Sequence, residues 1–393
     1  MAAIVSVNGL SMAVKNSTKK YKVAYVTGTR AEFGYMKRTL EEINKSPLME
    51  MVVVATGMHT MPGFGETIKD VGQSSLRVLT IQDGNDGKSL SSMAASVGSN
   101  ISQLSSIFEK EKPDILLVEG DRGEQLAATI AAAYLNIPIV HHGGGNTSGT
   151  IDNKIRWGIS AFADHHFPSN STLAGNLKKK GVPREKIYNI GGPVPDDIVL
   201  GYFQNAEECR KKYGLTKEGP VLFLVYHPNT EEHGKEEGQI DEVLKALSVL
   251  RYQTIAIGSN SDAGGHVINE QMEKFAHEYS FFKFYKNIPR FDFLGLLNVT
   301  DVLVGNTSAG FSESPSFKKP YVLIGSRQTG RFGETRHIIE VPSKDSRIVA
   351  AIHRALTDIR FRRGLKSLKN PYGKGDFYKK FPPLILEILQ KGE

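Results

Sequence analysis

Residues 115–156 read ILLVEGDRGEQLAATIAAAYLNIPIVHHGGGNTSGTIDNKIR, and this stretch decides the fold. It contains two apolar runs, Ile115–Val118 and Ile137–Val140, which have the length and composition of buried parallel strands. Polar residues follow each run directly, at positions 119–124 and 141–146. Because the carboxyl ends of parallel strands meet at one edge of a sheet, these polar residues are expected to converge where open α/β folds bind their ligands.

The alternation of short apolar runs and helical segments continues on both sides of this stretch. Lys22–Thr27 and Met51–Thr56 precede it as predicted strands. A boundary rich in glycine and proline at 191–197 is followed by further predicted strands at Val221–Tyr226, Gln253–Ile257, Phe281–Tyr285, Val302–Val304 and Tyr321–Ile324. The predicted fold class is therefore α/β, with two doubly wound Rossmann-like domains that face each other across a cleft.

This pattern divides the chain into four parts. Residues 1–20 form an N-terminal extension, 21–192 the first Rossmann-like domain, 193–375 the second, and 376–393 a C-terminal segment that bridges back to the first domain. In the last part, Pro382-Pro383 is predicted to open a short apolar helix, because proline is well tolerated at the first position of a helix.

Composition and charge limit the kind of function. The 393 residues carry a net charge of +7, a mild excess that suits an anionic small molecule as well as nucleic acid. No Lys/Arg run with interleaved aromatic residues is present, which argues against nucleic acid as a partner. No apolar run reaches the roughly 18–20 residues of a membrane span, and the first twenty residues lack the order of a secretory signal. The single cysteine, Cys209, fits a reducing compartment, so we expect a cytoplasmic protein without a membrane partner.

Glycine-containing turns at strand ends mark candidate anion sites. The turn Gly28–Gly34 lies between a strand and a helix, and its Arg30 is either a diphosphate contact or a solvated loop residue. In the second domain, residues 305–310 (GNTSAG) follow a strand and open a helix, and Glu313 one turn along can accept hydrogen bonds from a ribose diol. Arg327 lies at the end of the next predicted strand. Taken separately, the residues at 305–310 could serve ordinary helix capping, and Arg327 could be an ordinary surface residue. Their clustering on adjacent strand ends favours a phosphate site that includes Thr307, Ser308 and Gly310.

The histidines support a small-molecule site better than a metal site. His227 ends a predicted strand, where it can donate to a phosphate or assist a leaving group, although a buried structural histidine is the competing interpretation. The adjacent His141 and His142 would point to opposite faces of a strand, and no third ligand follows at a recognisable spacing. We therefore predict neither a metal nor a cofactor.

Taken in order, these motifs resemble the hydrolysing UDP-N-acetylglucosamine 2-epimerases, a family built on the two-domain GT-B fold. The resemblance covers nearly the whole chain from Lys22 onward. The matching segments are 26–34 (VTGTRAEFG), 57–59 (GMH), 120–122 (GDR), 151–152 (ID), 155–156 (IR), 226–228 (YHP), 258–262 (GSNSD), 305–310 (GNTSAG) and 325–331 (GSRQTGR).

The resemblance implies a reaction in which UDP leaves UDP-N-acetylglucosamine with loss of the C2 proton, and water then adds to the glycal to give free N-acetylmannosamine. The C2 proton is not α to a carbonyl, so this chemistry needs a carboxylate held close to it and strong stabilisation of the departing UDP. The resemblance makes the first domain the sugar side and the second the UDP side. It assigns acid/base roles to Asp121 and Asp152. The residues that it places around the diphosphate are Arg30, His227, Ser308 and Arg327, and Glu313 is expected to bind the ribose. Arg122 and Asn260, which lie within the matched motifs, are expected to make further substrate contacts.

One position departs from the family pattern. The family usually carries a glutamate, described as catalytic, in a His-Gly-Gly-Glu sequence, and Gly145 stands where that glutamate would be. Asn146 can hydrogen-bond a sugar but cannot accept a proton at neutral pH. Either Glu124, three residues past Asp121, or His142 takes over the role, or the activity is reduced, altered or lost.

The leading hypothesis is a nucleotide-sugar enzyme that releases UDP and inverts C2. It would supply N-acetylmannosamine, or a 2,4-diacetamido relative, for sialic or nonulosonic acid synthesis. A non-hydrolysing epimerase and a GT-B glycosyltransferase are alternative enzymes, and a catalytically silent UDP-sugar binder is an alternative of another class. The expected partners are the UDP-sugar and further copies of the chain, as a dimer or tetramer.

Overall fold

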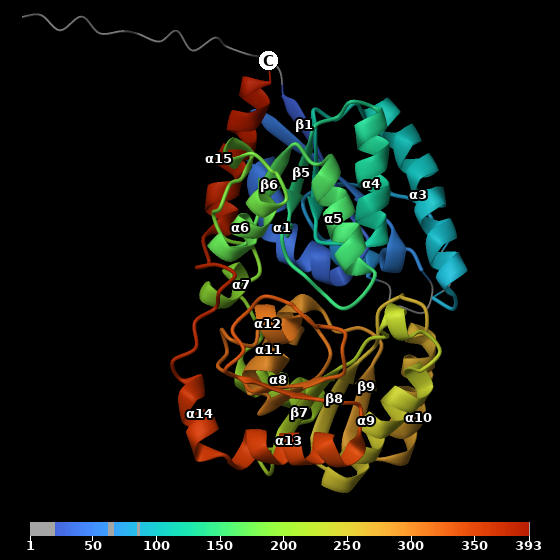
Figure 1. Ribbon diagram of the computed structural model, residues 1–393, viewed down its shortest axis with the longest axis vertical. Helices are drawn as coiled ribbons and strands as arrows, with labels where there is room; N and C mark the ends of the chain where they lie inside the picture. Colours follow the sequence, from blue (N-terminus) through green and yellow to red (C-terminus); the bar gives the residue numbers. More distant parts are fainter. Residues whose placement is uncertain (1–19, 62–66, 85–86, 393) are drawn as a thin grey trace, which may run out of the picture.

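The structure is a computed structural model that describes residues 20–61, 67–84 and 87–392. Two α/β domains, each with a six-stranded sheet, are stacked one above the other (Figure 1). This arrangement confirms the predicted fold class. The predicted N-terminal extension, residues 1–20, lies outside the described residues except for Lys20.

The first sheet is parallel, with the strand order β3-β2-β1-β4-β5-β6. After β3 the chain returns to the middle of the sheet, where β4 pairs with β1. Ligands of open α/β sheets bind beside such a reversal, outside the carboxyl ends of the strands. The strands are β1 (Tyr21–Thr27), β2 (Met49–Ala55), β3 (Arg77–Thr80), β4 (Ile115–Glu119), β5 (Ile139–His142) and β6 (His165–Phe167).

Helices pack on both faces of this sheet because successive strand residues point to opposite faces. In β1, Val23 and Tyr25 belong to a core with residues of α1, whereas Ala24 and Val26 pack with alanines of α4. The helices are α1 (Arg30–Asn44), α2 (Ile68–Gly72), α3 (Leu90–Glu111), α4 (Gly123–Tyr134), α5 (Asp152–Phe162) and α6 (Ser171–Lys179).

The second domain repeats this topology, with the order β12-β11-β10-β7-β8-β9 and the reversal between β7 and β10. Its strands are β7 (Val221–Val225), β8 (Gln253–Ile257), β9 (Phe282–Tyr285), β10 (Val302–Gly305), β11 (Tyr321–Ile324) and β12 (Ile338–Val341). Its helices are α8 (Ala206–Tyr213), α9 (Glu236–Leu250), α10 (Gly265–Glu278), α11 (Arg290–Val299), α12 (Ala309–Ser312), α13 (Asp345–Thr357) and α14 (Ile359–Leu365).

The chain passes between the domains at α7 (Asp196–Val199) and returns at α15 (Phe377–Lys391), drawn in red in Figure 1. The carboxylate of Asp196 accepts hydrogen bonds from the backbone N–H groups of Phe377 and Tyr378, at 3.2 and 2.8 Å. The prediction that Pro382-Pro383 opens this helix is wrong, because both prolines lie inside it. Capping by Asp196 starts the helix earlier, and burial of its apolar face in the first domain holds it together.

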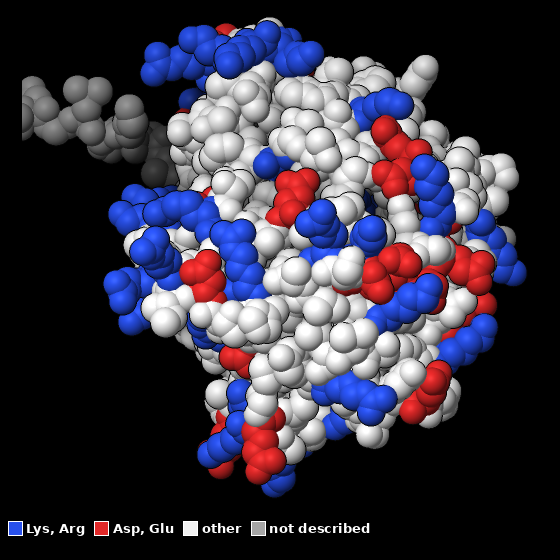
Figure 2. Space-filling view, turned by 60° about the horizontal axis from the view of Figure 1, so that its bottom comes forward, with Lys and Arg blue, Asp and Glu red and all other residues white. Residues whose placement is uncertain are grey.

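On the face that Figure 2 shows, basic and acidic side chains are interspersed with broad uncharged areas. Among the described residues, no helix combines the length and the apolar character needed to cross a membrane.

Candidate active site

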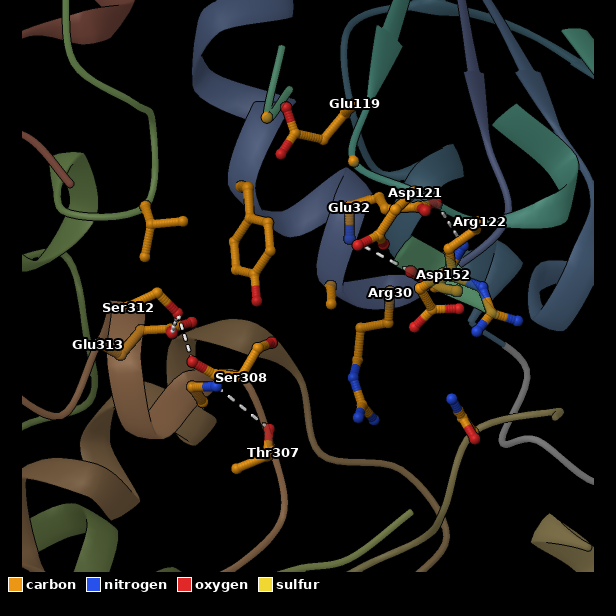
Figure 3. Close-up of a pocket in the computed structure, with 18 of the residues that line it drawn as sticks. Arg30, Glu32, Glu119, Asp121, Arg122, Asp152, Thr307, Ser308, Ser312 and Glu313 are labelled. Atoms are coloured by element: carbon orange, nitrogen blue, oxygen red, sulfur yellow. Dashed lines mark hydrogen bonds between the residues drawn. The ribbon is translucent and has the colours of Figure 1, made fainter. Parts of the chain in front are cut away.

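A cavity of about 260 Å³ lies between the two domains, at the carboxyl ends of both sheets. Figure 3 shows side chains of the first domain entering it opposite those of the second. The structure brings together most of the predicted site residues here: Arg30, Asp121, Arg122, His142, Asn146, Asp152, His227, Asn260, Thr307, Ser308, Glu313 and Arg327.

Asp121 is held in place by a buried arginine. Its carboxylate accepts a hydrogen bond from Nη2 of Arg156, a side chain that is 2% exposed. Arg156 also donates to the backbone oxygen of Asn146, with a distance of 3.3 Å. Because the guanidinium is anchored twice, Asp121 presents its carboxylate to the cavity in a defined orientation, as a proton-transfer group requires.

Asp152 lies at the border between the two halves of the site. It begins α5, and its carboxylate is 3.7 Å from Nη2 of Arg327 in the second domain. Burial, followed by the nearby Asp262, raises the pKa of Asp152, while Arg327 lowers it. The carboxylate can therefore exchange a proton or orient Arg327.

Cationic groups from both domains gather at the other end of the cavity. Arg122 donates to Asp262 across the domain boundary, with an Nη1–Oδ1 distance of 2.7 Å, and Arg30 donates to Asn287. Arg327 lies on the second-domain side and donates through Nε to the backbone oxygen of Pro228 at 3.2 Å. Three guanidinium groups at one end form an environment suited to a diphosphate.

His227 is a neutral hydrogen-bond donor in this group. Burial, followed by the positive charge of Arg327, lowers its pKa to about 3. Its Nδ1 accepts the backbone N–H of Asn260 at 3.2 Å, so the proton of the neutral ring resides on Nε2. An imidazole N–H that lines the cavity can donate to a phosphate oxygen.

Glu313 lies beyond the hydroxyl groups of Thr307 and Ser308. The Glu313 side chain is 1% exposed, pairs with Nη1 of Arg290 at 3.3 Å, and accepts a hydrogen bond from Ser312. These contacts orient the carboxylate of Glu313, whose oxygens can accept hydrogen bonds from a ribose diol.

Replacing Glu313 with alanine is expected to weaken UDP binding roughly 10- to 100-fold, because hydrogen bonds to a charged group are lost. Affinity for inorganic diphosphate, which has no ribose, should stay nearly unchanged in the same variant. Calorimetric titration with both ligands measures the difference, and a melting curve monitors the loss of the Arg290 partner. An unchanged affinity for UDP would remove Glu313 from the ribose site.

Two predicted residues lie outside the cavity lining. Glu124 lies beneath the turns at Gly28 and Gly57, where a Cβ atom on either glycine would come within 2.6 Å of its side chain, and it pairs with Nε of Arg122 at 3.5 Å. Gly310 packs against the ring of Tyr321, where a Cβ atom would lie 2.0 Å away. Because Glu124 lies beneath these turns, it is unlike a group that could replace the missing glutamate. Gly310 serves the packing of Tyr321.

Several residues that line the cavity were not among the predicted site residues. Glu32, Tyr35, Glu119 and Arg290 all line the cavity. Glu119 ends β4 two residues before Asp121, a spacing that could have indicated it. Arg290 begins a helix of the second domain far from any recognisable motif, and no sequence signal indicates it.

Glu32 is a buried carboxyl group that holds the turn before α1. Its Oε2 accepts the backbone N–H groups of Gly28 and Thr29, at 3.0 and 3.1 Å. Its Oε1 is buried and has no hydrogen-bond partner among the described residues. Burial, followed by the charge of Glu124, raises the pKa of Glu32 to about 8, so the side chain is protonated at neutral pH.

Replacing Glu32 with glutamine is therefore expected to change the pH dependence of stability. The native pKa is raised above the unfolded value of 4.5, so the stability contributed by this proton is complete below pH 4.5 and is lost as pH rises through about 8. The variant should match the wild type near pH 5 and exceed it by about 2–4 kcal/mol near pH 9. Urea unfolding at both pH values tests this, with Glu41→Gln on the same helix as control. An equal difference at both pH values would contradict the prediction.

The sequence and the fold both match known proteins. The family model described as UDP-N-acetylglucosamine 2-epimerase matches residues 41–386. A UDP-N,N'-diacetylbacillosamine 2-epimerase (hydrolyzing) of Legionella pneumophila is 32% identical over 377 residues, which cover 94% of this chain and 98% of the relative. Polysialic acid biosynthesis protein P7 of Escherichia coli is 32% identical over 358 residues, 90% of each chain. The crystal structure of a Neisseria meningitidis UDP-GlcNAc 2-epimerase bound to UDP-GlcNAc has the same fold, with a TM-score of 0.77 at 19% identity, covering 94% of this chain and 100% of that one.

Proposed function

The chain belongs to the UDP-N-acetylglucosamine 2-epimerase family, and from this premise we propose that it is a hydrolysing 2-epimerase of a UDP-linked 2-acetamido sugar. The two-sided cavity carries the proposal. Carboxylates of the first domain face the hydroxyl groups of Thr307 and Ser308 across it, with the guanidinium group of Arg30 between them (Figure 3). His227 also lines the second-domain side. A nucleotide sugar has a matching division, with a neutral sugar at one end and a charged diphosphate at the other.

In this proposal Asp121 takes the proton from C2 while the bond between C1 and the phosphate oxygen breaks. The electron pair of that bond leaves with UDP, and a C1=C2 glycal remains. Water then supplies its oxygen to C1, and a proton adds to C2 on the face opposite to the one deprotonated. The free sugar that results has the inverted configuration at C2.

The second domain supports the departure of UDP. Arg327 and the Nε2–H of His227 are close enough to the same end of the cavity to share the diphosphate, and Ser308 adds a hydroxyl donor. Preorganised donors of this kind stabilise the charge that develops on the leaving group without having to reorganise during the reaction.

The product would be free N-acetylmannosamine or a 2,4-diacetamido analogue. The names of the Legionella and Escherichia coli relatives concern a diacetamido sugar and polysialic acid. These names support a role in supplying a 2-acetamido sugar for sialic or nonulosonic acid synthesis.

An NMR time course in D2O tests the proposal, with UDP-GlcNAc and its 4-acetamido analogue as substrates. The expected result is free UDP together with a free sugar that is inverted and deuterated at C2. Epimerised UDP-sugar without free UDP would indicate a non-hydrolysing epimerase. UDP release only with an acceptor sugar would indicate a glycosyltransferase, and tight binding without any turnover would indicate a silent binder.

A further inference from the structure

Glu119 is a carboxylate of the first domain to which the proposed reaction assigns no step. It is the last residue of β4 and lies two residues before Asp121, and both residues line the cavity. Figure 3 shows Glu119 and Asp121 entering from the same side, opposite Ser308 and Glu313. In the proposed binding mode, Glu119 therefore lies beside the sugar of the nucleotide sugar.

His142 orients this carboxylate. Glu119 and His142 are register partners on the neighbouring strands β4 and β5, and Nδ1 of His142 bonds to Oε2 of Glu119. The imidazole is itself fixed, because its Nε2 lies 3.4 Å from the hydroxyl of Ser169 and its ring packs at 5.0 Å from the ring of Phe377. His142 thus acts through Glu119 rather than on a ligand directly.

The second oxygen of Glu119, Oε1, is left open. Within the part of the chain that the structure describes, it makes no hydrogen bond. A Cβ atom on the neighbouring Gly143 would lie 3.9 Å from Oε1, so the absence of a side chain there leaves the space beside this oxygen clear. An oriented carboxyl group with one open oxygen is suited to exchange a proton with a bound substrate.

The other carboxyl groups that line the described cavity are already engaged. Guanidinium groups hold three of them, and the fourth, Glu32, binds two backbone N–H groups and keeps its remaining oxygen buried. The three ion pairs are Asp121–Arg156, Asp152–Arg327 and Glu313–Arg290. Glu119 differs from these four because its partner is an imidazole, and its Oε1 makes no hydrogen bond among the described residues.

Resting on the proposed function, we propose that Glu119 is the second proton-transfer residue of this site and acts in the hydration of the glycal. In its protonated form it gives the proton on Oε1 to C2. The oxygen of water bonds to C1, and the proton that water gives up returns to Glu119. Asp121 releases the original C2 proton to solvent, so the sum is UDP-sugar plus water giving free sugar, UDP and a proton. Inversion at C2 requires that the proton arrives on the face opposite to the one from which Asp121 takes it, so the sugar would lie between the carboxylates of Asp121 and Glu119.

The test replaces Glu119 with glutamine and follows both half-reactions. Glu119→Gln is expected to release UDP and accumulate the 2-acetamido glycal, while formation of free sugar falls roughly 10²- to 10⁴-fold. When the glycal is supplied directly, the wild type should hydrate it and the variant should not. Free sugar formed at the wild-type rate, or a loss of UDP release without glycal, would overturn the role of Glu119.

Controls separate this inference from the proposed function and from misfolding. A wild-type protein that never releases UDP contradicts the proposed function, whereas a variant that behaves like an active wild type contradicts only the inference. Glu109→Gln, on the exposed surface of α3, is the matched control. If Glu119→Gln fails to fold, Glu119→Ala in the presence of sodium formate takes its place, and failure of formate to restore hydration counts against the proposal.

His142→Gln tests the positioning role of the imidazole. It should lower kcat, shift the pH profile of hydration and leave KM nearly unchanged. A fall in kcat without any shift in the pH profile would mean that His142 serves only the packing of β5.

Discussion

Replacing Asp121 with asparagine is expected to lower kcat roughly 10²- to 10⁴-fold, because asparagine keeps the shape of the side chain but cannot accept a proton. The Kd for UDP should change by no more than about threefold, because in the proposed binding mode the carboxylate contacts the sugar and not the diphosphate. Single-turnover release of UDP and calorimetric titration with UDP measure the two effects.

The variant also removes the partner of Arg156, whose side chain is 2% exposed. Breaking a buried pair costs about 3–5 kcal/mol when the remaining charge has no other partner. Here Arg156 keeps hydrogen bonds to Asn146 and Ser148, so the loss should be smaller. A melting curve checks that the protein stays folded, and Asp241→Asn on the surface of α9 is the matched control. A near-normal kcat in folded Asp121→Asn would show that another group takes the C2 proton.

Replacing Gly145 with alanine is expected to lower the free energy of unfolding by about 2–5 kcal/mol. The φ angle of Gly145 is +84°, a conformation that costs energy for any residue with a side chain. A Cβ atom there would also lie 2.4 Å from the carbonyl oxygen of Leu173, which belongs to the backbone and cannot rotate away. A glutamate at position 145 would have the same unfavourable φ angle and the same close contact with Leu173. The conformation of this turn therefore requires glycine.

Gly175 offers a matched control for this prediction. It lies in α6, two residues after Leu173, and a Cβ atom there would have nothing within 4 Å. Gly175→Ala should be neutral or stabilise the protein by up to about 1 kcal/mol, since alanine is the better helix former. Urea unfolding of both variants tests the comparison, and equal stabilities would show that the turn at Gly145 adapts to a side chain.

The fold was largely predictable because its strands are short apolar runs that end in glycine turns. The run Ile115–Val118 corresponds to β4, with one residue added. The second run was predicted at Ile137–Val140, but β5 spans Ile139–His142. The shift arises because His141 and His142 are buried within the sheet, whereas sequence reasoning assigned such polar residues to the following turn.

That small shift explains much of what the site prediction missed. Once His142 belongs to β5, Glu119 becomes its register partner, and the two side chains can meet. Most of the predicted site residues line the cavity, whereas Glu124 and Gly310 do not. Arg156 lies in the matched segment 155–156, which assigned it no role, and Arg290 lies in no motif. Both reach the cavity from helices, through tertiary packing.

The ion pair between Arg122 and Asp262 has a consequence for the end of the catalytic cycle. Asp262 also lies 3.8 Å from Arg327, so one carboxylate of the second domain serves two guanidinium groups. In the proposed reaction, a diphosphate bound by Arg122 and Arg327 would displace this carboxylate, which would remain close by on the second domain. As UDP departs, Asp262 would pair with both guanidinium groups again, so the contact that joins the two domains would also favour release of the product.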